Sequence, residues 1–238
     1  MRQIEEKTGW EASRAEVLFT ESVLGASEEH PKLLRAMRLQ NERWTALDAV
    51  RRAAEDGVVR ANARVSWVDL RLDGRVRAFA NELLRDAGGN KDDKTFRAFF
   101  PEAPSEVIRL GLESEIERCE RFNTVRERVT LSKAAAAKLA AVEAAISEGK
   151  AALQSRREAF AARTGVSLDV ESWKEATNAA RESVYLQLRT WALENGEERG
   201  YADRFFTSGS SRSTRTTAEE GEPGASKDSK DESNKPTG

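Results

Sequence analysis

Apolar residues in the segment 61–83 recur at steps of four or three residues. They are Ala61, Val65, Val68, Leu72, Val76, Phe79 and Leu83. At about 3.6 residues per turn, this spacing places them all on one face of an α-helix, whereas a half-buried strand would need strict alternation. The pattern predicts a helix from about Val58 to Ala87.

Asp73–Gly74 lies inside this stripe and is a strong signal for a β-hairpin turn. A hairpin centred there would place Arg71 opposite Val76, so neither face of the hairpin would be apolar. In a helix, Gly74 costs only about 1 kcal/mol relative to alanine. We therefore favour the helix and keep the hairpin as the alternative.

Stripes of the same period predict five further helices. The first starts at Thr8, where Thr8 and Glu11 have the spacing of a capping box, and stops at Gly25. The others span about 31–56, 104–129, 132 to a break at 163–169, and 170–194, and Asp56–Gly57 ends the second. The predicted fold class is all-α, an elongated bundle of about six helices over residues 1–206.

Four apolar residues of the fifth predicted helix lie seven residues apart, as in a coiled coil. They are Leu139, Ile146, Leu153 and Phe160. The second series of heptad positions, Val142, Gly149 and Arg156, is poor in large apolar side chains. The sequence therefore does not predict a free-standing coiled coil.

The aromatic pair Phe99–Phe100 recurs later in the chain as Phe205–Phe206. At the same offset, Ser66–Trp67 matches Ser172–Trp173 and Arg75 matches Arg181, while Phe79 aligns with Tyr185. We interpret these matches as a duplicated helical hairpin with repeat units 31–101 and 132–206.

In each unit the aromatic pair is predicted to fold back and close the end of the apolar stripe of its own helices. Phe79 should then lie near Phe99–Phe100, and Tyr185 near Phe205–Phe206. The alternative is that the pairs are exposed docking motifs for a partner.

Residues 207–238 differ in composition from the rest of the chain. They are rich in Ser, Thr and Gly, and their only apolar residues are two alanines. Such a segment cannot bury enough surface to offset chain entropy, so it is predicted to be a disordered tail.

Composition excludes several classes of protein. The net charge of −2 gives no overall attraction to nucleic acid or membranes, and Cys119 alone cannot form an internal disulfide. The N-terminus lacks the apolar core of a signal peptide and no run of apolar residues would span a membrane, so a cytoplasmic protein is expected. The excess of arginine over lysine, 28 against 11, together with abundant alanine, suggests a GC-rich bacterial genome.

The sequence offers little catalytic chemistry. His30 is the single histidine, so neither a di-iron site nor a structural zinc site can be built. Cys119 lies on the apolar face between Ile116 and Phe122, where a buried, unreactive thiol is expected. No catalytic, cofactor-binding or metal-binding residues are assigned, and no cofactor is expected.

The predicted function is that of a non-enzymatic structural or protein-interaction protein that acts through helix-packing surfaces, with a protein partner or self-association. Apolar positions left for such contacts include Phe19, Leu70 and Leu188. Two alternatives remain open. One is binding of nucleic acid or another polyanion through the Arg-rich segment 35–77, which holds Arg35, Arg38, Arg51, Arg52, Arg60, Arg64, Arg71, Arg75 and Arg77. The other is a Mg²⁺-dependent hydrolase that uses the cluster of Glu113, Glu117 and Glu120.

Overall fold

The computed structural model describes residues 1 and 3–207. All regular structure in this part of the chain is helical, which confirms the predicted all-α class. The elements are α1 (Trp10–Ser27), α2 (Pro31–Asp86), α3 (Lys94–Phe99), α4 (Pro104–Ile108), α5 (Leu112–Arg126), α6 (Lys133–Asn195) and the short 3-10 helix η1 (Tyr201–Phe205). One compact unit spans Met1–Thr207. The predicted disordered tail, 207–238, lies outside the described residues except for Thr207.

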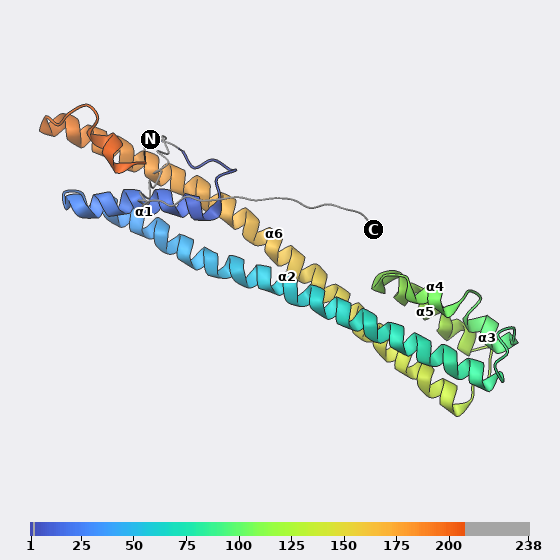
Figure 1. Ribbon diagram of the computed structural model, residues 1–238. Coiled ribbons are helices and arrows are strands. Elements are labelled where there is room, and N and C mark those ends of the chain that lie inside the picture. Colours follow the sequence, from blue (N-terminus) through green and yellow to red (C-terminus); the bar gives the residue numbers. More distant parts are fainter. Residues whose placement is uncertain (2, 208–238) are drawn as a thin grey trace, which may run out of the picture. The chain divides into compact units, whose positions relative to one another are not determined.

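Two long helices, α2 and α6, run antiparallel and form the largest interface of this unit (Figure 1). Polar contacts fix their register. Arg71 Nη1 donates to Glu148 Oε2 at 2.8 Å, and Trp173 Nε1 donates to the backbone oxygen of Gln40 at 3.1 Å. At 1.5 Å per residue, α2 alone is about 84 Å long.

The breaks predicted at Asp56–Gly57 and at 163–169 are wrong, because α2 and α6 each continue through them. A glycine inside a helix costs about 1 kcal/mol, which the apolar stripes on either side offset. Val58 and Val166, the residues that follow Gly57 and Gly165, are both buried. Asp73–Gly74 is also helical, so the hairpin alternative is wrong as well.

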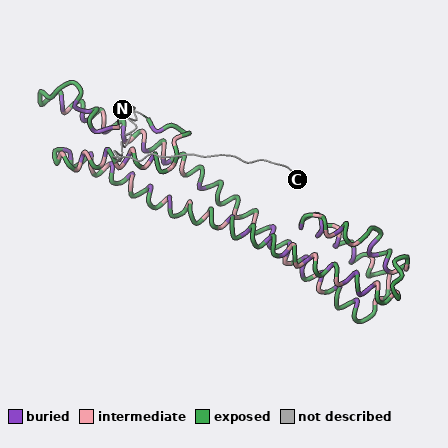
Figure 2. The backbone as a smooth tube through the Cα atoms, viewed as in Figure 1, coloured by how far each residue is buried: buried purple, intermediate pink, exposed green. Residues whose placement is uncertain are grey.

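The α2–α6 pair is thinly packed around these two glycines. Between Leu153 and Trp173, a stretch that the structure describes in full, Val166 is the only buried residue of α6. The middle of the pair is accordingly mostly exposed in Figure 2. The buried residues instead concentrate towards the two ends, where further helices cover the pair.

Replacing Gly57 or Gly165 with alanine should raise the free energy of unfolding by about 0.5–1 kcal/mol each. A Cβ atom at either position meets no atom within 4 Å, so helix propensity is gained without a clash. Urea denaturation followed by circular dichroism measures the effect. Gly149→Ala is the matched control and should lose stability; a loss at position 57 or 165 would contradict the prediction.

Gly149 of α6 lies where α5 packs directly against α6. A Cβ atom there would lie 2.7 Å from Ile116 Cδ1 and 3.3 Å from Leu112 Cδ1, both on α5. The residue that weakens the heptad pattern of α6 therefore makes room for a third helix. This contact joins α5 to the end of the pair formed by the C-terminal part of α2 and the N-terminal part of α6.

The helix predicted over 104–129 is divided into α4 and α5, with Gly111 as the N-cap of α5. Val107 and Leu112 are both buried. In a continuous helix, side chains five residues apart would point about 140° away from each other. The break at 109–111 lets both reach the core.

The other end of the pair is covered by α1 and η1. Trp10 of α1 stacks on Trp44 of α2 and meets the edge of Trp173 of α6, each at a centroid distance of 5.0 Å. The predicted capping box is absent, because Gly9 is the N-cap and Thr8 Oγ1 accepts instead from the Glu5 amide at 3.0 Å. The stop predicted at Gly25 comes slightly later, at Ser27, followed by Glu28 in a left-handed conformation with φ of 56°.

Both aromatic pairs are buried, as predicted. Phe99, Phe100, Phe205 and Phe206 are each 3% exposed or less. Ring centroids of Phe79 and Phe99 lie 5.1 Å apart, and those of Tyr185 and Phe206 lie 5.6 Å apart. The predicted neighbours of each pair are therefore confirmed, and the docking alternative for the pairs is wrong.

Each aromatic pair also contacts the opposite half of the chain, which the prediction missed. Phe100 lies 5.2 Å from Phe122 of α5, and Phe205 lies 5.7 Å from the ring of His30, just before α2. Each pair thus closes a core to which both halves contribute. The segments 31–101 and 132–206 share the order of a long helix followed by a short aromatic one, and their duplication stays a hypothesis.

Candidate protein-interaction surface

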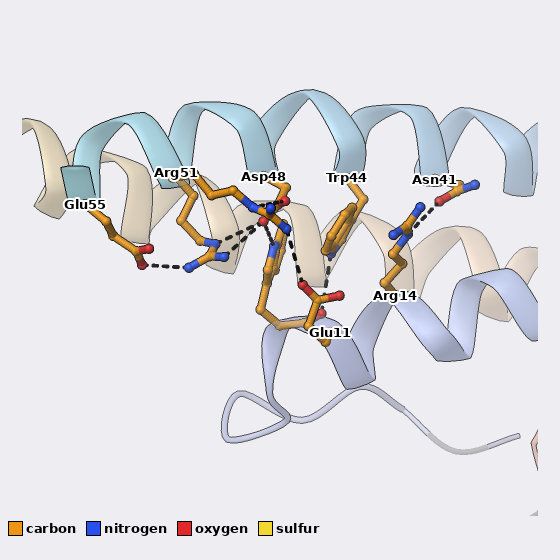
Figure 3. A network of polar contacts seen from close by, with 9 residues as sticks. Glu11, Arg14, Asn41, Trp44, Asp48, Arg51 and Glu55 are labelled. Atoms are coloured by element: carbon orange, nitrogen blue, oxygen red, sulfur yellow. Dashed lines mark hydrogen bonds and ion pairs between the residues drawn. The ribbon is translucent and has the colours of Figure 1, made fainter. Parts of the chain in front are cut away.

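The start of the Arg-rich segment is part of a dense polar network between α1 and α2 (Figure 3). Asp48 accepts hydrogen bonds from Trp10 Nε1 at 2.9 Å and Arg51 Nη2 at 3.0 Å, and its other oxygen lies 2.7 Å from Arg52 Nε. Burial alone would raise the pKa of the Asp48 carboxyl, but these hydrogen bonds and the charge of Arg52 lower it overall. The network joins the two helices and neutralises two of the candidate arginines.

Half of the other arginines of the segment 35–77 also have an acidic partner. Arg38 pairs with Glu21, Arg60 with Asp56, Arg71 with Glu148 and Arg77 with Asp73. Arg35, Arg43, Arg64 and Arg75 have no ion pair among the described residues. Positive charge without a partner is therefore confined to a few positions rather than spread along the whole segment.

The three glutamates of the predicted Mg²⁺ cluster lie on the exposed face of α5. Glu113 pairs with Arg157 at 2.6 Å and Glu120 with Lys150 at 2.5 Å, so they connect α5 to α6. Within residues 1 and 3–207, no group of His, Cys, Asp or Glu side chains is arranged to hold a metal ion.

His30 and Cys119 are both core residues. His30 is the N-cap of α2, and its ring Nε2 lies 2.9 Å from the Tyr201 hydroxyl; burial lowers its pKa. Burial and, to a lesser degree, Glu115 raise the pKa of the Cys119 thiol to about 12. A thiol held in its protonated form is a poor nucleophile, which agrees with the predicted unreactive role.

Sequence reasoning missed a buried acidic group between α5 and α2. Glu115 is completely buried and neither of its carboxyl oxygens has a hydrogen-bond partner in the described structure. Burial, together with Asp73 and Asp69 of α2, raises the pKa of Glu115 to about 8. The available signal was its position three residues after Leu112, on the apolar face of α5.

A buried cation at the other end was missed too. Arg181 of α6 is completely buried; its Nη2 donates to Glu16 Oε2 of α1 at 2.9 Å, and its guanidinium lies 5.5 Å from the centre of the Phe206 ring. Desolvation lowers its pKa, although Glu16 opposes the shift. This ion pair connects α1 to α6 and has a structural role.

The described part of the chain leaves large apolar side chains exposed on the side of α2 that faces away from α6. Val59, Trp67 and Leu70 are exposed by 67%, 61% and 64%. They share one helical face because they follow each other at steps of eight and three residues. Arg60 and Arg64, seven and three residues before Trp67, border this stripe along one side. We refer to these five residues as the α2 face.

A second exposed apolar stripe follows the C-terminal half of α6. It contains Leu168, Leu186 and Leu193, interspersed at helical spacing with Glu171, Glu175 and Glu182, and we refer to these six residues as the α6 face. The three glutamates hold no ion pair within residues 1 and 3–207. Leu188, which the sequence suggested for such a surface, is instead completely buried, whereas Phe19 and Leu70 are exposed.

Comparisons with protein-family models, with curated proteins and with solved structures give no significant match. Among the described helices, none is long and apolar enough to cross a membrane. The surfaces of the chain itself are therefore the basis for a functional proposal.

Proposed function

We propose that this chain is a non-enzymatic structural protein that self-associates through the α2 face and the α6 face. The observation that carries the proposal is Trp67, a large aromatic side chain that is 61% exposed in the middle of a long, regular helix. Exposed tryptophan costs solubility and is enriched where proteins bind each other. Leu70 and Val59 extend the exposed apolar area on the same face.

A second copy of the chain is the occupant that best complements the α2 face. Arg64 has no acidic partner in the described structure, and the glutamates of the α6 face have no basic partner there. Arg60 and Arg64 outnumber Asp56 along the α2 face, and the three glutamates outnumber Arg189 along the α6 face, so the net charges of the two faces are opposite in sign. Helix-to-helix packing would then bury both stripes and pair the charges at the edge of the contact.

The arrangement of the two faces favours an open assembly. The buried stripes of α2 and α6 face each other, so the exposed stripes lie on opposite sides of the helix pair. A contact between two different faces of the same molecule is heterologous, and unless the rotation closes a ring it continues from copy to copy. We therefore expect the copies to form an extended assembly. The same proposal places this assembly in the cytoplasm.

Two double variants test this arrangement. Trp67→Ser/Leu70→Ser disrupts only the α2 face, and Leu186→Ser/Leu193→Ser disrupts only the α6 face. Light scattering coupled to size-exclusion chromatography should show growing assemblies for the unmodified chain at increasing concentration and monomers for each variant alone. An equimolar mixture of the two variants should form a one-to-one pair and nothing larger, because one intact face of each kind remains.

Leu39→Ser/Val50→Ser is the matched control, since it removes two exposed apolar residues of α2 that lie outside the face. It should assemble like the unmodified chain. A chain that stays monomeric at all concentrations, a mixture that stays monomeric, or self-association of either single-face variant would each overturn the proposal. If the chain is monomeric and Arg64→Glu/Arg75→Glu abolishes salt-dependent retention on heparin, the polyanion-binding alternative would replace it.

A further inference from the structure

One hollow in the described part of the chain lies at the end of α2 that is far from the α6 face. It is a groove of about 710 Å³ between the C-terminal part of α2, the turn that follows it, α3 and α4. Pockets that bind small molecules typically measure roughly 300–1,000 Å³. We infer that this groove, with its apolar floor and cationic rim, binds a small amphiphilic anion of the type of a medium-chain carboxylate.

The floor of the groove is apolar and belongs to the core. Ala80, Phe96 and Phe100 line it and are 4%, 6% and 1% exposed. Phe100 is itself packed against Phe79 and Phe122, at centroid distances of 6.0 Å and 5.2 Å. Because these rings hold each other in place, the floor is formed before any ligand binds.

The rim of the groove is predominantly basic. Arg77, Lys91, Arg97 and Arg109 line it, against a single acidic residue, Glu102. The carboxylate of Glu102 already accepts from Arg118 at 2.5 Å. The net charge of the lining side chains therefore favours a negatively charged ligand.

Two of the rim cations are available to a ligand without loss of a buried contact. Lys91 forms no ion pair with any described residue. Arg97 Nη2 lies 2.6 Å from Asp92 Oδ1, but the two side chains are 55% and 81% exposed. Exposed ion pairs contribute little to stability, so the guanidinium can exchange Asp92 for a ligand carboxylate.

This combination selects the chemical class of the ligand. A purely polar anion would leave Phe96 and Phe100 unused, and a neutral hydrocarbon would leave the basic rim without a partner. A molecule with an unbranched apolar chain and one terminal carboxylate places the chain over the two rings and its charge at Lys91 and Arg97. Burial of the chain supplies affinity, and the head group fixes the orientation.

Isothermal titration calorimetry of the full chain with octanoate, decanoate and dodecanoate, below their micelle-forming concentrations, tests the inference. Binding should be saturable with one site per chain, and each added methylene should tighten Kd about fourfold. Dodecyltrimethylammonium, which keeps the tail and reverses the head-group charge, should bind at least about tenfold more weakly, because it loses a charge-assisted hydrogen bond. Circular dichroism during the titration should show unchanged helicity.

Two variants locate the site. Asn81→Trp introduces a large side chain from an exposed position on the groove wall and should abolish binding, whereas Asn62→Trp, at an exposed position of α2 outside the groove, should not. Lys91→Glu should weaken dodecanoate binding roughly tenfold, whereas Arg75→Glu, which makes the same change of charge elsewhere on the surface, should leave it unchanged. Equal binding of the two head groups, no saturable site, or unaltered binding by both Asn81→Trp and Lys91→Glu would overturn the inference.

Discussion

Phe100→Ala should lower the free energy of unfolding by about 3–5 kcal/mol, the largest single effect that we expect. The Phe100 ring is 1% exposed and lies within 6.0 Å of the ring centroids of Phe79, Phe96 and Phe122. Alanine removes the apolar contacts and leaves a cavity that the surrounding rings cannot fill, because they hold each other in place. Urea denaturation followed by circular dichroism at equal protein concentration gives the difference.

Phe160→Ala is the matched control for this measurement. The Phe160 side chain is 37% exposed, and its one described ring contact is with the Arg163 guanidinium, at 4.9 Å. Its removal should cost less than about 1 kcal/mol, since little packing is lost. Similar losses for the two variants would show that the aromatic pair at the C-terminal end of α3 does not close the core there.

Glu115→Gln should make the protein more stable than the unmodified chain at alkaline pH. In the folded protein the pKa of Glu115 is about 8, compared with 4.5 for an unperturbed glutamate. The folded state therefore binds more protons than the unfolded state between these values, so stability falls as pH rises from about 5 to about 8. Glutamine stays neutral, which removes this loss, and the advantage of the variant should reach about 2–4 kcal/mol at pH 8.

The pH dependence separates this effect from a general change in packing. Near pH 4, where the Glu115 carboxyl is protonated in the folded state and mostly protonated in the unfolded state, the variant and the unmodified chain should have similar stability. The control is Glu113→Gln, which removes an exposed acid from the same helix, where ion pairs are weak. A stability difference that is constant from pH 5 to pH 8 would contradict the prediction for Glu115.

The helical class and the position of the core could be predicted because they follow from local periodicity. The stripe from Ala61 to Leu83 indicated the face of α2 that packs on α6, and Phe79 and Tyr185 were correctly assigned to the two aromatic pairs. The helix ends were harder to predict. Gly57 and Gly165 lie in segments whose residues are typical of a helix break. The buried valines that follow them stabilise a continuous helix instead, and this stabilisation depends on a partner helix that is distant in sequence.

The features that concern function depend on contacts between distant segments. In the sequence Gly149 only weakens a heptad pattern, and its role in making room for α5 is visible only in the folded structure. Glu115 likewise resembles the other acids of its Arg- and Glu-rich helix, and only the fold brings it close to Asp69 and Asp73. The groove combines α2, α3 and α4, and α4 is separate from α5 because of the break at 109–111, which periodicity did not indicate. Trp67 lies outside the stripe from Ala61 to Leu83, so its exposure follows from the same periodicity, whereas its counterpart in the sequence match, Trp173, is 6% exposed.

The ammonium group of Met1 lies 3.7 Å from Asp203 Oδ1, close to the last described residues. A polypeptide or a solid support attached at Met1, or joined directly after Thr207, would therefore be tethered at the same end of the helix pair. The cluster of α3, α4 and α5 would then project from the tether by nearly the length of α2 (Figure 1). Fluorophores near Met1 and Thr207 would exchange energy efficiently with each other and poorly with one on α3, and the groove would stay accessible in either kind of fusion.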